Sequence, residues 1–282
     1  MKRTRPLETV ISPGRGGLLG SIIESWRYRE LLYFLAWRDV KVRYKQTVMG
    51  AAWAIIQPLA TMVIFTLIFS RMMKLSTEGI PYPVFAFAGL LPWTLFQSAL
   101  GQSSSSLLRQ TSLLSKVYFP RLLVPLSSVV SALLDFGLAL LVLAGLMVWY
   151  GVKPSWGLTT LPLFVLLALA SALAVGVWFA ALSVKYRDFR YVVPFALRLW
   201  LFLSPVAYPS EKLISQIPPN CRWIYDLNPM TGVLDGFRWG LFSASSSPMP
   251  GSVLMSALVV AVTLACGLLY FRRVERTMVD LL

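Results

Sequence analysis

The chain has 282 residues, of which 57% are hydrophobic and only 13% are charged, yet its net charge is +14. Soluble domains carry about 25% charged residues, and a nucleic-acid binder needs a solvated basic face that such a composition rarely supplies. Histidine is absent, which excludes His-based triads, proton shuttles and metal sites, and the two cysteines cannot form a zinc site or a disulfide framework. The mean hydropathy of +0.68 indicates instead an integral membrane protein with its positive charges on one side.

Six stretches are long and apolar enough to cross a bilayer, which takes about 20 residues. Pro92 interrupts the second stretch, Asp135 lies in the third and Arg198 lies in the fifth. The sequence therefore predicts an all-α integral membrane protein with six transmembrane helices. It divides into a cytoplasmic N-terminal segment, 1–48, and a six-span transmembrane domain, 49–282. The predicted spans are 49–70, 79–108, 122–150, 154–184, 191–210 and 251–271.

Lysine and arginine residues are distributed unevenly between the two sides of these spans. Nineteen of the 26 fall before the first span, in the second–third and fourth–fifth connections, or after the last span. Cytoplasmic segments of membrane proteins carry the excess of positive charge. The sequence therefore predicts a multi-pass protein of the cell membrane with both termini in the cytoplasm.

Residues 22–45, ahead of the first span, are predicted to form an amphipathic helix at the cytoplasmic membrane interface. Aromatic residues recur on one helical face, at Trp26, Tyr33, Trp37 and Tyr44. Basic residues lie towards the flanks of this face, within reach of lipid phosphates, as in other interfacial helices. The alternative is a cytoplasmic helix packed on the underside of the bundle.

The connection between the second and third spans is short, aromatic and basic. Pro120 stops a helix and leaves Tyr118 and Phe119 exposed beside Lys116 and Arg121. Exposed aromatic and basic side chains on a small protrusion suit docking into a groove of a partner protein. An interfacial aromatic belt with basic side chains reaching the lipid headgroups explains the same residues equally well.

Residues 211–250, between the fifth and sixth spans, are too apolar for a solvated loop. Apolar residues recur at helical spacing over about a dozen residues, a length too short to cross the bilayer, and prolines at 218, 219 and 229 break the region into pieces. The pattern predicts a re-entrant helical hairpin on the periplasmic side, serving as a lid or gate, or as a structural plug. The recurring residues are Met230, Val233, Leu234, Phe237 and Leu241.

The charges inside the predicted spans are functional candidates, because a charge in the membrane is costly. Asp135 and Arg198 could pair with each other, or Arg198 could meet an anionic substrate. Reaching the cytoplasmic interface is the simpler explanation of Arg198, and a structural hydrogen bond is the simpler one of Asp135. Tryptophans inside the spans are candidates for stacking on sugars, at Trp93, Trp178 and Trp200.

The sequence offers no catalytic or energy-converting site of its own. It contains no G-x-x-x-x-G-K-[ST] phosphate loop, so it has no Walker-type ATP site, and its scattered acidic residues form no metal-binding pattern. Energy for work must then come from another subunit or an ion gradient. The rival classes are a gradient-driven secondary transporter, which usually shows inverted repeats, and a membrane-embedded transferase for lipid-linked sugars, which needs a catalytic constellation.

Several motifs, in order along the chain, resemble those of polysaccharide-exporting ABC transporter permeases. The first is the run 37–45, which continues through Met49-Gly50, Trp53 and Gln57-Pro58 into the first span. The others are the Gly-Leu-Leu-Pro-Trp run 89–93, the turn 115–121, the Lys-Tyr-Arg-Asp run 185–188, Ser204-Pro205-Val206 and Leu227-Asn228-Pro229-Met230. Together they extend from about residue 30 to residue 240.

This resemblance implies a permease of the cell inner membrane that forms a homodimer and binds two copies of an ABC ATPase. The ATPase would bind ATP and Mg²⁺, so no cofactor is expected in this chain, and the substrate would be a lipid-linked polysaccharide such as O-antigen, capsule or teichoic acid. The turn would be the coupling helix, formed by Lys116, Val117, Tyr118, Phe119, Pro120 and Arg121. Candidate residues of the translocation path or gate are Trp93, Asp135, Arg198, Asn228 and Phe237.

Overall fold

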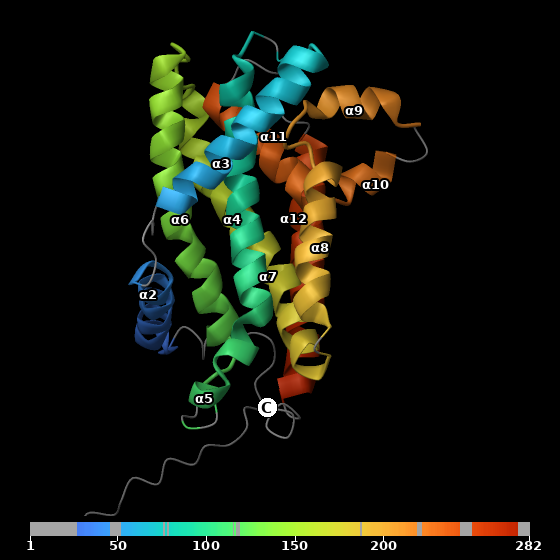
Figure 1. Cartoon of the computed structure of the whole chain (residues 1–282). Helices are drawn as coiled ribbons and strands as arrows, with labels where there is room; N and C mark the ends of the chain where they lie inside the picture. Colours follow the sequence, from blue (N-terminus) through green and yellow to red (C-terminus); the bar gives the residue numbers. More distant parts are fainter. Residues whose placement is uncertain are drawn as a thin grey trace, which may run out of the picture.

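The computed structural model describes residues 27–45, 52–75, 77, 79–114, 116, 119–186, 188–218, 222–242 and 250–275. Every regular element within these ranges is helical (Figure 1). The elements are α2 (Arg29–Lys45), α3 (Ala52–Phe65) with its π-helical continuation η1 (Thr66–Met72), α4 (Tyr82–Arg109), α5 (Thr111–Leu114), α6 (Leu123–Trp149), the 3₁₀ helix η2 (Trp156–Thr160), α7 (Leu161–Lys185), α8 (Phe189–Leu203), α9 (Ser210–Gln216), α10 (Arg222–Asp226), α11 (Pro229–Phe242) and α12 (Pro250–Glu275).

Five helical segments of the described residues are long and apolar enough to cross a membrane. They are Ala52–Met72, Tyr82–Arg109, Leu123–Trp149, Trp156–Lys185 and Gly251–Glu275, and they confirm five of the six predicted spans. The predicted span 191–210 is different, because its helix, α8, has 15 residues, or about 22 Å at 1.5 Å per residue. The chain leaves the helix at Ser204 and turns through Pro205, a residue that lacks the backbone N–H needed to continue it.

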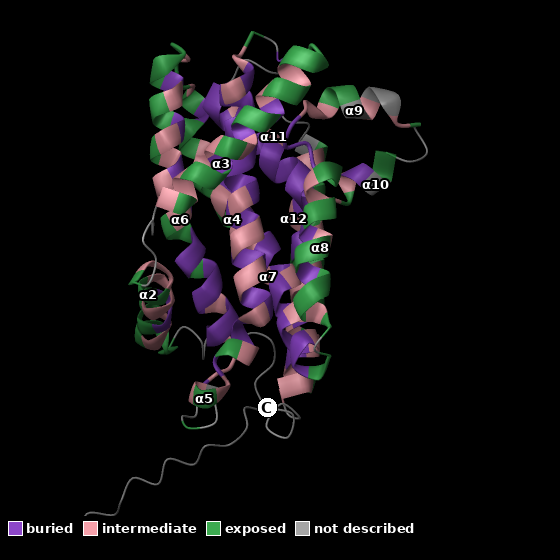
Figure 2. Ribbon diagram, in the orientation of Figure 1, coloured by how far each residue is buried: buried purple, intermediate pink, exposed green. Residues whose placement is uncertain are grey.

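Helix α4 lies at the centre of the bundle and packs most extensively on α7 and α6. Figure 2 shows buried residues concentrated on α4, α7 and α11, with exposed residues along α8. Small residues allow the close approach of α4 and α7: a Cβ added at Gly176 of α7 would lie 2.6 Å from the Ser103 Oγ of α4. Such small-residue contacts are the usual means by which membrane helices pack closely.

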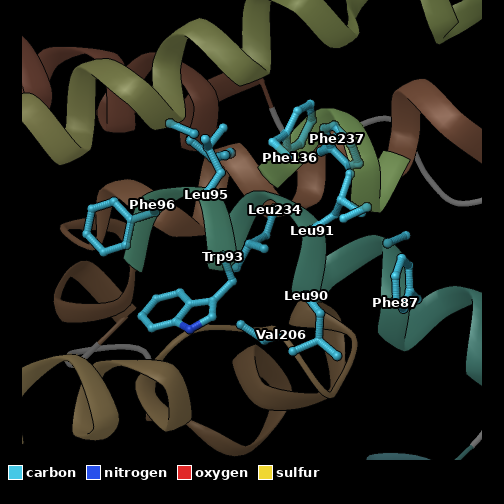
Figure 3. Packing of buried hydrophobic residues seen from close by; sticks show 14 of the residues in the cluster. Phe87, Leu90, Leu91, Trp93, Leu95, Phe96, Phe136, Val206, Leu234 and Phe237 are labelled. Carbon is cyan, nitrogen blue, oxygen red and sulfur yellow. The ribbon is translucent and has the colours of Figure 1, made fainter. Parts of the chain in front are cut away.

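Pro92 does not interrupt α4, which is one continuous helix on both sides of it. The largest buried side chains surround this part of α4 (Figure 3). Trp93 packs on Phe96, Phe96 meets Trp200 of α8 edge-on at a centroid distance of 5.0 Å, and Phe136 of α6 meets Phe237 of α11 at 6.2 Å. With the buried residues of α3 and α7 in the same cluster, the main core joins α3, α4, α6, α7, α8 and α11.

The bundle has two distinct ends. Helix α5 and the last turns of α12 lie at one end, which we call the α5 end, whereas α9 and α10 lie towards the opposite, α9 end (Figure 1). Helix α2 lies beside α6, on which it packs. The residues with predicted roles are therefore spread over both ends and over the space between α2 and the bundle.

Candidate functional site

The turn predicted to dock a partner lies at the α5 end. Lys116 is exposed as expected, but Phe119 is only 5% exposed, so the prediction of an exposed Phe119 is wrong for the isolated chain. Val117 and Tyr118 lie outside the described residues. Phe119 is buried because it packs in a second hydrophobic cluster that joins α2, α4, α6, α7 and α12. The other buried members are Leu35, Leu107, Leu123, Val124, Val177, Ala180, Ala181, Val184 and Phe271.

The last residue of the turn connects it to the C-terminal helix. The guanidinium of Arg121 donates a hydrogen bond of 2.7 Å to the backbone oxygen of Glu275, at the end of α12. This hydrogen bond and the burial of Phe119 connect the turn to α12 and α7, so a displacement of the turn would be transmitted to both helices.

Helix α2 presents two of its predicted aromatic residues outwards, with Tyr33 67% exposed and Trp37 45% exposed. The buried residues of α2 are instead Leu35 and Ala36, and the fourth predicted aromatic residue, Tyr44, contacts Asp135 of α6. Trp26 lies outside the described residues. An exposed aromatic face on a helix that packs on α6 is compatible both with a membrane interface and with a further protein contact.

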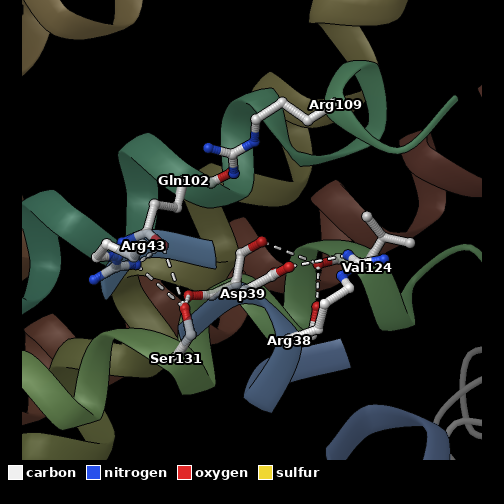
Figure 4. Close-up of polar contacts among 9 residues, drawn as sticks. Arg38, Asp39, Arg43, Gln102, Arg109, Val124 and Ser131 are labelled. Carbon is white, nitrogen blue, oxygen red and sulfur yellow. Dashed lines mark hydrogen bonds and ion pairs between the residues drawn. The ribbon is translucent and has the colours of Figure 1, made fainter. Parts of the chain in front are cut away.

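Asp135 of α6 is bound by the end of α2. Arg43 forms an ion pair with the Asp135 carboxylate and also donates to the side chain of Gln102 on α4, and the Tyr44 hydroxyl donates to Asp135. Figure 4 shows Arg43 between Gln102 and Ser131. Burial, with a further contribution from the Asp135 carboxylate, raises the pKa of Tyr44 to about 12, so its hydroxyl remains a hydrogen-bond donor.

These contacts decide between the two explanations of the charges in the spans. Asp135 makes structural bonds, and the suggested pairing with Arg198 is wrong, because Arg43 occupies the carboxylate while Arg198 lies exposed on α8. Arg43 was not singled out from the sequence, because it is one of ten basic residues before the first span. Gln102 is a polar residue within a predicted span, which was a usable signal.

A cavity of about 720 Å³ lies between α2, α3, α4 and α6, with α5 at one end, next to this network. Its size falls in the range of about 300–1,000 Å³ that is typical of ligand sites. Thr94, Gln97, Ser98 and Gln102, on one face of α4, line it. A row of polar side chains on a membrane-spanning helix is expected where the helix faces protein or a polar cavity rather than lipid.

The remaining candidates for a path or gate are structural in this conformation. Trp93 and Phe237 are 1% and 0% exposed, so neither ring has a free face for a sugar. Asn228 caps α11, since its side-chain oxygen accepts from the Met230 N–H at 3.1 Å. The same amide accepts from the Trp200 indole at 2.9 Å and donates to the Ser204 hydroxyl at 3.0 Å, which joins the start of α11 to the end of α8.

A buried arginine that the sequence pattern did not indicate connects α11 to the turn after α8, at the α9 end. Arg238 of α11 is 4% exposed and donates to the backbone oxygens of Pro205 (2.6 Å) and Val206. Its guanidinium also lies 3.8 Å from the centroid of the Phe85 ring, a favourable cation–π geometry. Asp235, one turn earlier, accepts a hydrogen bond from Ser210 at the start of α9. The available signal was a charged residue within the apolar repeat of 230–241.

We expect the stability of the α9 end to depend on pH through Asp235. Burial raises the pKa of the Asp235 carboxyl from 3.8 to about 6. The folded chain therefore binds more protons than the unfolded chain between these values, and stability falls as the pH rises through them. The melting temperature of the protein in nanodiscs should be higher at pH 5 than at pH 7.5.

The Asp235→Asn variant should show a smaller change in melting temperature between the two pH values. Asp226→Asn, on the neighbouring helix α10, controls for the removal of one acidic residue. An unchanged pH dependence in Asp235→Asn would contradict the assignment.

Within the described residues, no three His, Cys, Asp or Glu side chains are grouped to hold a metal ion.

Comparison with known proteins places this arrangement in a family. The chain is 32% identical over 255 residues to an O-antigen export system permease protein of Myxococcus xanthus, covering 89% of this chain and 96% of the relative. It is 30% identical over 213 residues to such a protein of Klebsiella pneumoniae (74% and 79%), and 26% identical over 254 residues to a polysialic acid transport protein of Escherichia coli (86% and 92%). The model of the ABC-2 type transporter family matches residues 30–242. The chain therefore belongs to the ABC-2 type transporter family.

Proposed function

We propose that this chain is the transmembrane permease subunit of an ATP-driven exporter of lipid-linked polysaccharide. The similarity to an O-antigen export permease and to a polysialic acid transport protein, over 86% or more of the chain in each case, carries this proposal. Five helices of sufficient length and hydropathy to cross a membrane support it, as does the lack of a phosphate loop in the sequence. The polymer is of the O-antigen, capsular or teichoic-acid type.

In the proposed topology the α5 end faces the cytoplasm, and both termini lie on that side of the inner membrane. The basic residues of the second–third connection and of the end of α12 support this orientation. Helix α8 provides the sixth crossing together with the Ser204–Tyr208 turn, and α2 lies at the cytoplasmic interface. Helices α9 to α11 form a re-entrant hairpin that caps the bundle on the periplasmic side.

A separate ATPase docks at the α5 end of the protein, at the turn that includes Lys116. It binds the ATP and Mg²⁺, and two copies serve a dimer of this permease. The exposed apolar side chains of α8, such as Phe195, Leu199 and Phe202, suit contact with lipid or with the second permease. Closure of the ATPases then moves the turn, and with it α7 and α12 through Phe119 and Arg121, as a rigid-body transition.

Co-expression with an ABC ATPase encoded beside this chain tests the proposal. The two proteins should co-purify, and the lipid-linked polymer should stimulate ATP hydrolysis by the complex in nanodiscs. Lys116→Glu should reduce the recovered ATPase at least several-fold, because it reverses a charge at the docking turn. Arg222→Glu, an exposed residue of α10, is the matched control at the opposite end. Failure of the ATPase to co-purify with the wild-type permease would contradict the proposal.

A further inference from the structure

The cavity between α2, α3, α4 and α6 extends along α4 from Arg109 to Thr94. This is a distance of about 22 Å at 1.5 Å per residue. Arg109, with Ser112 and Leu113 of α5, lines one end, while Ala139 and Leu95 line the opposite end. The cavity is thus polar and charged at one end and more apolar at the other. It is lined by residues of one chain, none of them in the described parts of α9, α10 or α11, and at one end it reaches Ser112 and Leu113, just before the docking turn.

The charges of this cavity largely compensate one another within the protein. Arg43 pairs with Asp135, and Arg38 lies 2.9 Å from the carboxylate of Asp39 (Figure 4). Arg109 donates to the backbone oxygen of Gln102 at 2.7 Å. An anionic ligand would have to compete with two carboxylates for these guanidinium groups, at a cost in electrostatic energy. The cavity is therefore better matched to an uncharged ligand.

The neutral polar groups of the cavity are amides and hydroxyls on facing helices. Gln97 of α4 is oriented by the core, since its side-chain oxygen accepts from the indole N–H of the buried Trp93 at 3.0 Å. The NH₂ group of Gln97 is then the part of the amide that can meet a ligand. Gln57 of α3 and Thr94 and Ser98 of α4 line the same cavity. These groups supply the donors and acceptors that sugar hydroxyls require.

The cavity also has an aromatic wall. Trp53 of α3 lines it and is 56% exposed, unlike Trp93, whose ring is enclosed in the core. Trp53 precedes Gln57 by four residues, so the two side chains lie on the same face of α3. An indole ring offers an electron-rich face to the C–H groups of a sugar ring. An aromatic face beside amides is a suitable site for a neutral pyranose.

We propose that this cavity binds an uncharged sugar unit, with Trp53 stacking on the ring and Gln57 and Gln97 bonding its hydroxyls. The proposal rests on the proposed export of polysaccharide and adds a sugar-binding site inside each permease. It assigns roles to three residues that were not among the predicted path or gate positions. Trp93 takes the role of a positioning residue, because it orients Gln97 without facing the ligand.

Protection of a cysteine placed in the cavity tests this site. The permease, co-expressed with its ATPase and held in nanodiscs without ATP, carries Ser98→Cys in a background in which Cys221 and Cys266 are serine. Labelling by a maleimide is measured with glucose, mannose and galactose hexasaccharides, and with an acidic oligogalacturonate of equal length. At least one neutral oligosaccharide should slow the labelling, and the acidic one should have a weaker effect.

Variants of the aromatic wall and of the amides then locate the contact. Trp53→Ala and Gln57→Leu should each raise the half-protecting concentration roughly tenfold, which corresponds to the loss of one good contact. Trp53→Phe should retain most of the binding. Trp156→Ala is the matched control, because Trp156 is 97% exposed and outside the cavity.

Protection only by the acidic oligomer, or by none of the sugars, would overturn the proposal. Equal behaviour of Trp53→Ala and Trp156→Ala would overturn it as well. Co-purification of the ATPase, recorded on the same samples, reports on the proposed function independently. A permease that binds its ATPase but shows no sugar protection thus refutes the site alone, whereas loss of the ATPase refutes the exporter assignment.

Discussion

Replacing Arg238 with methionine is expected to destabilise the folded protein by about 3 kcal/mol, since hydrogen bonds to charged donors contribute about 1.5–3 kcal/mol each. The guanidinium donates to the backbone oxygens of Pro205 and Val206. These carbonyls belong to residues buried in the turn after α8. Methionine fills a similar volume but leaves both oxygens without their donor, and a buried polar group without a partner is costly.

The packing around Arg238 shows how closely its guanidinium is enclosed. Gly89 of α4 lies against the guanidinium, and a Cβ at this position would be 2.6 Å from the Val206 oxygen. The Phe85 ring lies on the other side of the guanidinium. The turn after α8, helix α4 and helix α11 therefore meet at one cation, and its loss should release the turn from both helices.

The melting temperature of the protein in nanodiscs measures this effect. For a chain of this size, 1 kcal/mol corresponds to about 2–4 °C, so the expected decrease for Arg238→Met is about 6–12 °C. Arg222→Met, on the exposed surface of α10, removes the same charge and should change the melting temperature by about 1 °C, as surface substitutions usually do. Similar decreases in both variants would show that Arg238 does not hold the turn.

A double-mutant cycle on Arg43 and Asp135 is expected to give a coupling energy of about 1–3 kcal/mol, the range for close charge pairs with limited solvent access. Asp135→Asn leaves Arg43 without its counter-ion, and Arg43→Gln leaves the Asp135 carboxylate with the Tyr44 hydroxyl as its partner. The double variant removes both charges. It should therefore be more stable than the sum of the two single effects predicts.

Melting temperatures of the four proteins in nanodiscs provide the cycle. Arg38→Gln is the matched control, because Arg38 pairs with Asp39 of the same helix and is more exposed than Arg43. Pairs of this kind contribute about 0–1 kcal/mol. Strictly additive effects of Arg43→Gln and Asp135→Asn would contradict the conclusion that this ion pair stabilises the packing of α2 on the bundle.

The fifth predicted span shows where hydropathy is insufficient. The apolar stretch 191–210 has the composition of a span, but its helix ends after Leu203. The turn that follows is held by Arg238, 32 and 33 residues further along the chain. A window of hydropathy cannot distinguish apolar residues that face lipid from apolar residues such as Val206 that pack in a turn against another helix.

Phe119 illustrates the same limit for exposure. Its neighbours in sequence are basic and aromatic and are typical of a protruding turn, yet the second cluster buries it against residues of α2, α7 and α12. Burial depends on which segments converge on a side chain. No local pattern contained that information, and the resemblance to a coupling helix gave no indication of it.

Local properties of the sequence were sufficient to predict five spans and to show that the sequence has no phosphate loop. Hydropathy and short motifs can be identified within windows of about 20 residues. They also restricted the chemistry, since a chain without histidine cannot use it. The partner of Asp135 could not be predicted from such a window, because Arg43 is 92 residues away. The cavity beside it draws its lining from five helices, α2 to α6. Such contacts form only when distant segments pack together, so the folded bundle alone determined which polar groups meet and which aromatic ring, Trp53 rather than Trp93, is accessible.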